Sequence, residues 1–119
     1  MESIKNRYAI VGVGESERSK NSGTTPLHLA LDAARAALND AGLQAQDIDG
    51  FMSYSENDSC TSHQLSTYLG VRPKYVKDIL GGGSSTEMLI ADAVGLIESG
   101  QLNTVLIYRS MNGRSGVRM

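Results

Sequence analysis

The chain has 119 residues, which is enough for one domain with a single hydrophobic core. Its formal net charge is −2, and its 11 Lys and Arg residues are scattered along the sequence. The basic cluster of Arg109, Arg114 and Arg118 is too sparse to follow a phosphate backbone, so the composition argues against nucleic-acid binding. No apolar run approaches the about 20 residues that span a bilayer. The single cysteine excludes an internal disulfide. We therefore expect a cytoplasmic protein without a membrane span.

The first half of the chain predicts a strand followed by a helix. Tyr8–Val13 is a continuous, partly β-branched run, typical of a buried strand, and a polar loop over 14–23 follows it. Thr25 and Pro26 form a strong helix start, with Thr25 as the N-cap. Apolar residues then recur at helical spacing until Gly42, which we expect to be a left-handed cap.

The second half continues the alternation of strands and helices. The predicted elements are strands at Phe51–Ser55, Tyr75–Leu80 and Thr104–Tyr108, and helices at Ser62–Leu69 and Ser84–Ser99. This order predicts an α/β fold with a mostly parallel sheet and helices on its faces. Residues 110–119 read as a terminal loop, and we expect the chain to be a piece of a larger fold.

The helix predicted from Ser84 differs from the earlier ones because apolar residues surround nearly its whole circumference. Such a helix is normally buried between two layers. The spacing of Ser84 and Glu87 predicts a capping box at its start. A chain this short cannot cover such a helix, so we expect self-association or pairing of strand Tyr75–Leu80 with a partner.

Gly81, Gly82 and Gly83 precede this helix and form the strongest candidate site. The first amides of a helix lack intrahelical partners and carry positive potential, which favours bound negative charge. A tight turn that needs unusual dihedral angles is the alternative explanation. Ser84 and Ser85 are better explained as helix caps than as nucleophiles.

Other chemically suggestive residues have simpler explanations. Gly12 and Gly14 lack the third glycine and the immediate helix of a dinucleotide-binding fingerprint. Cys60 and His63 suggest a Cys–His pair, but the sequence offers no further ligands nearby for a metal site. His28 falls on the polar face of its helix. Four charged residues after Gly14 are most simply explained as a charged surface loop, namely Glu15, Glu17, Arg18 and Lys20.

Several of these segments together resemble the N-terminal part of the thiolase superfamily. The likeness is strongest to the branch of sterol-carrier-protein-x thiolases and bacterial lipid-transfer-protein-like steroid aldolases. The segments that carry it are Tyr8–Gly14, Ala30–Gly50, Gly81–Gly83 and Tyr108–Gly116. The resemblance covers about residues 8–119 and implies a layered α/β/α half-domain, incomplete here, with a sheet around a buried helix. It implies that residues 1–119 are the truncated or split N-terminal part of a thiolase-like domain.

The resemblance also implies lipid metabolism on acyl-CoA thioesters, with no cofactor besides the CoA thioester substrate and no metal. Thiolases of this acyltransferase family carry a nucleophilic cysteine at the start of the buried helix. That position is Gly83 or Ser84 here, and neither is a cysteine. We identify no catalytic residue in this chain and assign the acyl-CoA and oxyanion region to Gly82, Gly83, Ser84 and Ser85.

A vacant cysteine position favours retro-aldol cleavage of a carbon–carbon bond next to the thioester over thiolysis. The alternative is a non-catalytic thiolase-like subunit that binds acyl-CoA or lipid, or that scaffolds a catalytic partner. By resemblance, partners would be a second copy in a homodimer and a small zinc-ribbon and OB-fold protein. Under either hypothesis this chain alone is expected to be inactive.

Overall fold

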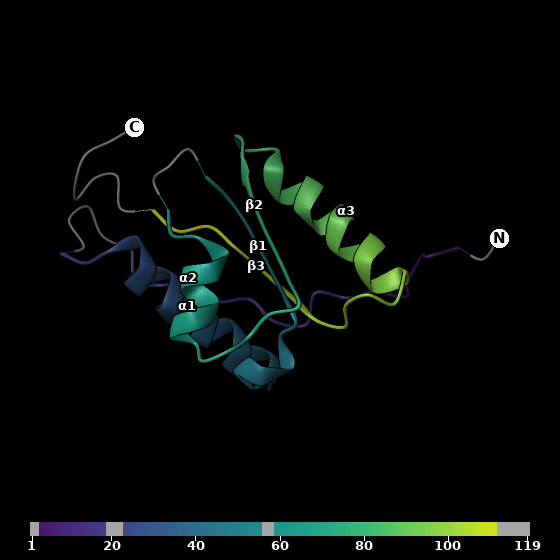
Figure 1. Ribbon diagram of the computed structural model, residues 1–119, viewed down its shortest axis with the longest axis horizontal. Coiled ribbons are helices and arrows are strands. Elements are labelled where there is room, and N and C mark those ends of the chain that lie inside the picture. Colours follow the sequence, from purple (N-terminus) through teal and green to yellow (C-terminus); the bar gives the residue numbers. More distant parts are fainter. Residues whose placement is uncertain (1–2, 19–22, 56–58, 112–119) are drawn as a thin grey trace.

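The computed structural model describes residues 3–18, 23–55 and 59–111. Figure 1 shows three strands in one sheet, with α3 on one face and α1 and α2 on the other. The helices are α1 (Pro26–Ala41), α2 (Ser62–Tyr68) and α3 (Ser85–Glu98), with a short 3₁₀ helix at Ala45–Asp47. The strands are β1 (Gly50–Ser55), β2 (Tyr75–Leu80) and β3 (Val105–Tyr108). This arrangement confirms the predicted layered α/β/α architecture.

The sheet is parallel throughout, with strand order β2-β1-β3. Its central strand β1 pairs with β2 from Gly50 opposite Tyr75 to Ser55 opposite Leu80. Alternate residues of each strand therefore point to opposite faces, which separates two cores. Phe51, Leu65 and Leu106 belong to the core under α1 and α2, whereas Met52 and Leu89 belong to the core under α3.

Helix α1 begins and ends as the sequence predicts. The Thr25 side chain accepts a hydrogen bond from the His28 amide, and Pro26 takes the first helical position. Gly42 closes the helix in the left-handed conformation, at φ 72°. The helix buries its apolar face, which comprises Ala30, Leu31, Ala34 and Leu38.

The predicted strand at Tyr8–Val13 is wrong. This segment forms no strand, and its large aliphatic side chains are exposed, with Ile10 at 73% and Val13 at 71%. A strand needs a neighbour that supplies hydrogen bonds, and the segment instead lies against α1, where the Val13 amide donates to the Asp40 carboxylate at 2.9 Å. Gly12 lies so close to α1 that an added Cβ would come within 2.6 Å of the Ala37 carbonyl oxygen.

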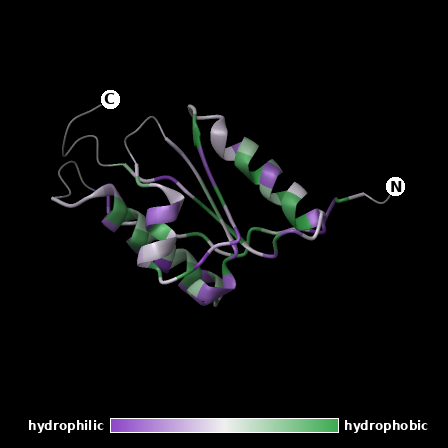
Figure 2. Cartoon of the chain, in the orientation of Figure 1, coloured by the Kyte–Doolittle hydropathy of each residue, from purple (hydrophilic) through white to green (hydrophobic). Residues whose placement is uncertain are grey.

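Helix α3 is apolar on most of its surface but is covered by the sheet on one side (Figure 2). Ser85, Leu89 and Ala93 are buried against the sheet, whereas Met88 is 57% exposed. Among the described residues, no second layer covers the outer side of α3. The helix is therefore incompletely buried, as its composition and the length of the chain predict.

The predicted capping box of α3 is also wrong. Ser84 has helical dihedral angles, φ −78° and ψ −6°, and its side chain makes no capping hydrogen bond. An N-cap side chain reaches the helix amides from an extended backbone, which Ser84 does not have. The Ser85 amide instead donates to the Gly82 carbonyl at 3.0 Å, so a tight turn leads into the helix.

The terminal loop predicted over 110–119 falls outside the described residues after Met111, and so do Arg114 and Arg118. Ser110 is described and is buried, and its hydroxyl donates to the Pro26 carbonyl at 2.5 Å. The end of β3 is therefore tied to the start of α1.

Candidate functional site

The order of the strands identifies one edge of the sheet as the place for a ligand. The chain moves from β1 to its neighbour β2 through α2, then returns across β1 to β3 through α3. Because crossovers between parallel strands are right-handed, this reversal of direction places α2 and α3 on opposite faces. Open α/β sheets bind ligands at such a reversal, in the crevice beyond the carboxyl ends of the strands. Here the reversal lies between β1, which leads toward α2, and β2, which leads into α3.

The turn from β2 into α3 lies at this edge of the sheet and contains Gly81, Gly82 and Gly83. None of the three has a positive φ, so a left-handed backbone does not explain why they are glycines. A Cβ at Gly81 would collide with the Ser85 hydroxyl, whereas a Cβ at Gly82 or Gly83 would meet no heavy atom within 4 Å. The turn therefore has open space beside it, immediately before the first amides of α3.

The two serines of the predicted acyl-CoA region differ in exposure. Ser84 is exposed at the end of the turn, and Ser85 is 3% exposed under it. Glu87 lies in the first turn of α3, where an acidic side chain complements the helix dipole. The structure places Gly82, Gly83 and Ser84 on the surface at the carboxyl edge of the sheet, with Ser85 directly beneath them.

Cys60 lies on the other side of this edge, just before α2, and is packed into the core. Its side chain is 7% exposed and its Sγ lies 3.9 Å from the Tyr108 hydroxyl. The Tyr108 hydroxyl in turn donates to the Cys60 carbonyl at 2.8 Å. Burial raises the pKa of the Cys60 thiol, an effect that its contact with the Tyr108 hydroxyl only partly offsets. A buried thiol with a raised pKa is a poor nucleophile.

His63 is exposed on α2, and its backbone carbonyl accepts hydrogen bonds from the hydroxyls of Ser66 and Thr67. The described residues contain no cluster of three or more His, Cys, Asp or Glu side chains with metal-ligand geometry. The burial of Cys60 favours a structural role at the α2 entry as the explanation of the Cys–His spacing.

A polar row across the sheet is the feature that the sequence analysis missed. Ser53 of β1 lies opposite both Asp78 of β2 and Tyr108 of β3, on the face under α1 and α2. The Asp78 carboxylate accepts hydrogen bonds from the Ser53 hydroxyl at 2.5 Å and from the Ser62 hydroxyl at 2.7 Å. The Ser62 amide also donates to it, at 3.0 and 3.1 Å to the two carboxylate oxygens.

The sequence did hold signals for this row. Ser53 and Asp78 are polar residues that interrupt the apolar positions of their strands, and a buried donor such as the Ser53 hydroxyl needs an acceptor. Thr61 and Gln64 have the spacing of a capping box at the start of α2, and both of its hydrogen bonds form.

The opposite face of the sheet, under α3, carries two cationic side chains. Lys77 of β2 forms an ion pair with Asp92 of α3 at 2.6 Å, and this hydrogen bond raises the pKa of the lysine. The guanidinium of Arg109 lies 5.2 Å from the centre of the Tyr54 ring. The first contact fixes α3 on β2, and the second joins the ends of β1 and β3.

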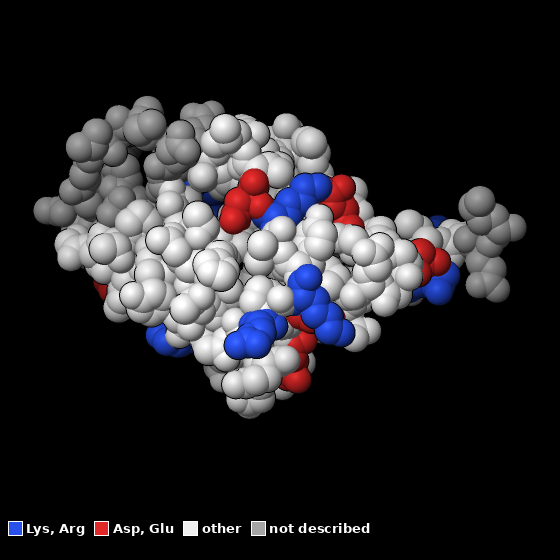
Figure 3. Space-filling view, viewed as in Figure 1, with Lys and Arg blue, Asp and Glu red and all other residues white. Residues whose placement is uncertain are grey.

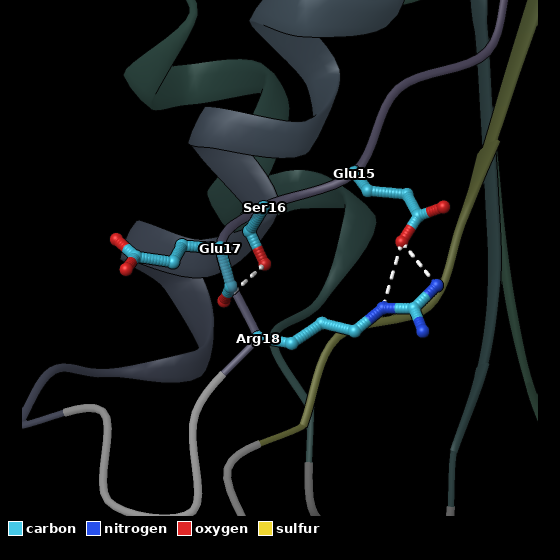
Figure 4. Close-up of polar contacts among 4 residues, drawn as sticks. All are labelled: Glu15, Ser16, Glu17 and Arg18. Carbon is cyan, nitrogen blue, oxygen red and sulfur yellow. Dashed lines mark hydrogen bonds and ion pairs between the residues drawn. The ribbon is translucent and has the colours of Figure 1, made fainter.

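The charged loop after Gly14 behaves as a surface segment. Arg18 donates through Nε and Nη2 to the Glu15 carboxylate, at 3.0 and 2.6 Å (Figure 4). Glu15, Glu17 and Arg18 are all exposed, whereas Lys20 lies outside the described residues. His28 is exposed on α1, and its Nε2 lies 3.4 Å from a carboxylate oxygen of Asp32.

Basic and acidic side chains are intermixed on the face shown in Figure 3. No helix within the described residues has the length and apolar character of a membrane span.

Comparison with curated proteins finds relatives that match nearly all of this chain. It is 37% identical over 111 residues to a steroid side-chain-cleaving aldolase from Thermomonospora curvata, a match that covers 92% of this chain and 28% of the relative. It is 34% identical over 116 residues to a 17-hydroxy-3-oxo-4-pregnene-20-carboxyl-CoA lyase from Mycobacterium tuberculosis. That match covers 97% of this chain and 30% of the relative. The chain thus spans less than a third of the length of these relatives. No protein-family model matches it.

Solved structures agree with these relatives. The chain matches the Ltp2-ChsH2(DUF35) aldolase with a TM-score of 0.85 and 35% identity, over 93% of this chain and 29% of that one. It matches a monomeric SCP2-thiolase like protein from Mycobacterium smegmatis with a TM-score of 0.68 and 31% identity, over 82% of this chain and 22% of that one. The fold is shared with a 3-oxoacyl-[acyl-carrier-protein] synthase III from Aquifex aeolicus, at 23% identity and a TM-score of 0.63. That match covers 71% of this chain and 29% of the other. This chain belongs to the thiolase superfamily, in the branch of the steroid side-chain-cleaving aldolases.

Proposed function

We propose that this chain forms part of an enzyme that cleaves a carbon–carbon bond next to an acyl-CoA thioester by a retro-aldol step. The observation that carries the proposal is the open turn at Gly82 and Gly83, exposed before the first amides of α3 and without a cysteine. The family of the chain and the names of the two curated relatives reported above, an aldolase and an acyl-CoA lyase, support the same chemistry.

In such a step a base removes the proton of the β-hydroxyl group, and the bond between the α and β carbons breaks. The electron pair of that bond moves onto the thioester as an enolate, which is then protonated. The products are a ketone or aldehyde and a shortened acyl-CoA. Amide donors at a helix start stabilise the negative charge on the thioester oxygen. We assign this role to the region of Gly82, Gly83, Ser84 and Ser85. No cofactor beyond the CoA thioester substrate is required.

The base and the remaining walls of the site are proposed to come from outside these 119 residues, because the chain spans less than a third of its relatives. The chain alone is therefore expected to be inactive. The test is to supply a β-hydroxyacyl-CoA to a longer protein that carries this sequence and to follow release of the carbonyl product. Cleavage that requires free CoA and yields a new thioester would instead indicate thiolysis and overturn the retro-aldol proposal.

The second candidate function is a non-catalytic subunit that binds acyl-CoA or lipid or scaffolds a catalytic partner. The missing cysteine favours it equally. Binding of acyl-CoA by the longer protein without cleavage, even when the partner is present, would support this candidate against the enzyme.

We also propose that β2 pairs with a second copy of the chain. One edge of β2 pairs with β1 and the other faces outward, and Val76 and Leu80 are 42% and 73% exposed. Its charges give little protection against pairing, because Lys77 is bound to Asp92 and Asp78 to two serines. Light scattering should give a dimer for the chain and a monomer for Val76→Pro, which removes an edge amide. A monomeric wild-type chain would overturn this pairing, and the monomeric relative from Mycobacterium smegmatis makes that outcome a real test.

A small partner protein with a zinc ribbon and an OB-fold is a further proposal. A solved structure similar to this chain is an aldolase named as Ltp2-ChsH2(DUF35), which supports it. Co-expression of the longer protein with a zinc-ribbon and OB-fold protein from the same source, followed by size-exclusion chromatography, tests for a complex.

A further inference from the structure

We infer that Asp78 is a positioning residue, which fixes two chain segments relative to each other at the carboxyl ends of β1 and β2. One segment is the entry to α2 at residues 59–61, and the other is the turn to α3 at residues 81–84. The functional meaning of this inference rests on the proposed acyl-CoA cleavage, whereas its geometry does not.

The contacts of Asp78 converge from three elements. Asp78 lies on β2, only two residues before the strand ends at Leu80, and its carboxylate binds Ser53 of β1 and Ser62 of α2. These two serines are 2% and 0% exposed. The carboxylate therefore connects the edge strand, the central strand and the start of α2.

Asp78 itself is exposed on the edge strand. Its accessible carboxylate therefore accepts hydrogen bonds from two buried hydroxyls. The Ser62 amide is at the first position of α2, where no carbonyl of the same helix is available to accept its hydrogen bond. An oxygen from a neighbouring strand fixes both the position and the direction of this short helix. Shortening Asp78 leaves two buried hydroxyls without this acceptor and frees the α2 entry to move relative to β2.

Asp49 provides a matched control at the opposite end of the sheet. Its carboxylate accepts hydrogen bonds from the amides of Asn103 and Thr104, at 2.8 and 3.0 Å, just before β1 begins. Asp49→Ala therefore also removes a carboxylate that binds backbone amides, but at the opposite end of the strands from Asp78.

The test is amide hydrogen exchange on the 119-residue chain and its variants. The reporters are the amides of Gln64, bonded to the Thr61 hydroxyl at 3.1 Å, and Ser85, bonded to the Gly82 carbonyl at 3.0 Å. In Asp78→Ala we expect both amides to exchange at least about tenfold faster than the change in global stability explains. Asp78→Asn should restore most of the protection, because its carboxamide can accept from Ser62 and donate to Ser53. Asp49→Ala should leave the two reporters at the global rate.

Equal effects of Asp78→Ala and Asp49→Ala on the two reporters would overturn the inference, since Asp78 would then contribute only to global stability. The link to function is tested in the longer protein by kcat and KM for a β-hydroxyacyl-CoA. We expect Asp78→Ala to lower kcat/KM at a temperature where the variant is folded, and Asp78→Asn to recover it. An unchanged kcat/KM would overturn that link. If the wild-type protein shows no turnover, the proposed function fails while the exchange result still decides the positioning role.

Discussion

The hydroxyl of Tyr108 donates a hydrogen bond to the backbone carbonyl of Cys60 at 2.8 Å, and both residues are buried. The bond joins the last residue of β3 to the segment that enters α2, 48 positions apart in the sequence. A backbone carbonyl in this irregular segment has no strand or helix to pair with, so a side chain must satisfy it.

Tyr108→Phe should therefore destabilise the chain. The variant keeps the ring in the core but leaves the Cys60 carbonyl without its donor, which costs about 1–3 kcal/mol. Urea unfolding followed by circular dichroism measures the change. Tyr54→Phe is the matched control, because Tyr54 is only partly buried and contacts Arg109 through its ring face. Equal stability losses for the two variants would contradict this account of Tyr108.

The same two residues predict a loss of stability at alkaline pH. Burial raises the pKa of Tyr108 above its ordinary value of 10.0 and that of Cys60 above 9.0. Both groups bind their protons more tightly in the folded chain than in the unfolded chain. Their contribution is complete below the ordinary pKa values and is lost as the pH rises past them toward the raised values. Unfolding free energies measured between pH 7 and pH 11 should fall above about pH 9. The Tyr108→Phe variant should show a shallower fall.

The Cys60 thiol should react slowly with iodoacetamide at pH 8 while the chain is folded. Its burial and raised pKa both reduce the available thiolate. In urea the same thiol should react at the rate of a small thiol such as N-acetylcysteine. Rapid labelling of the folded chain would show that Cys60 is accessible and would reopen its role as a nucleophile.

A cysteine placed at Gly83 should be more reactive than one placed at the other end of α3. In a Cys60→Ala background, Gly83→Cys lies before the first amides of the helix, where positive potential stabilises a thiolate. Ser99→Cys, at the exposed C-cap, is the control because the negative end of the dipole opposes the thiolate. We expect roughly threefold to tenfold faster alkylation of Gly83→Cys at pH 7. Equal rates would argue against electrostatic stabilisation at this turn.

Gly12 and Gly83 should respond in opposite ways to alanine. A Cβ at Gly12 would come within 2.6 Å of the Ala37 carbonyl oxygen and 2.8 Å of the Ala41 Cβ, so backbone must move. Gly12→Ala should cost about 1–3 kcal/mol. A Cβ at Gly83 meets open space, and Gly83→Ala should change the stability by less than about 0.5 kcal/mol. Thermal unfolding of both variants tests this contrast, which a large loss in Gly83→Ala would contradict.

The sequence predicted the elements whose signals are local. Thr25, Pro26 and Gly42 mark the ends of α1 through the hydrogen bonds and dihedral angles that each residue type supplies. The run at Tyr75–Leu80 begins with Tyr75 and Val76 and ends with Ile79 and Leu80, and its predicted limits agree with β2. These features depend on residues within a few positions of one another, which is why pattern alone identifies them.

Tertiary structure decided what depends on distant partners. Tyr8–Val13 has a β-like sequence but forms no strand, because a strand exists only when a neighbour supplies its hydrogen bonds. Ser84 has the spacing of a cap but a helical backbone, which the turn from β2 sets. Asp78 meets Ser53 and Ser62 because the parallel register brings β1 beside β2 and the crossover brings α2 above them. No local pattern contains that register, since it arises from how the apolar faces of distant segments pack together.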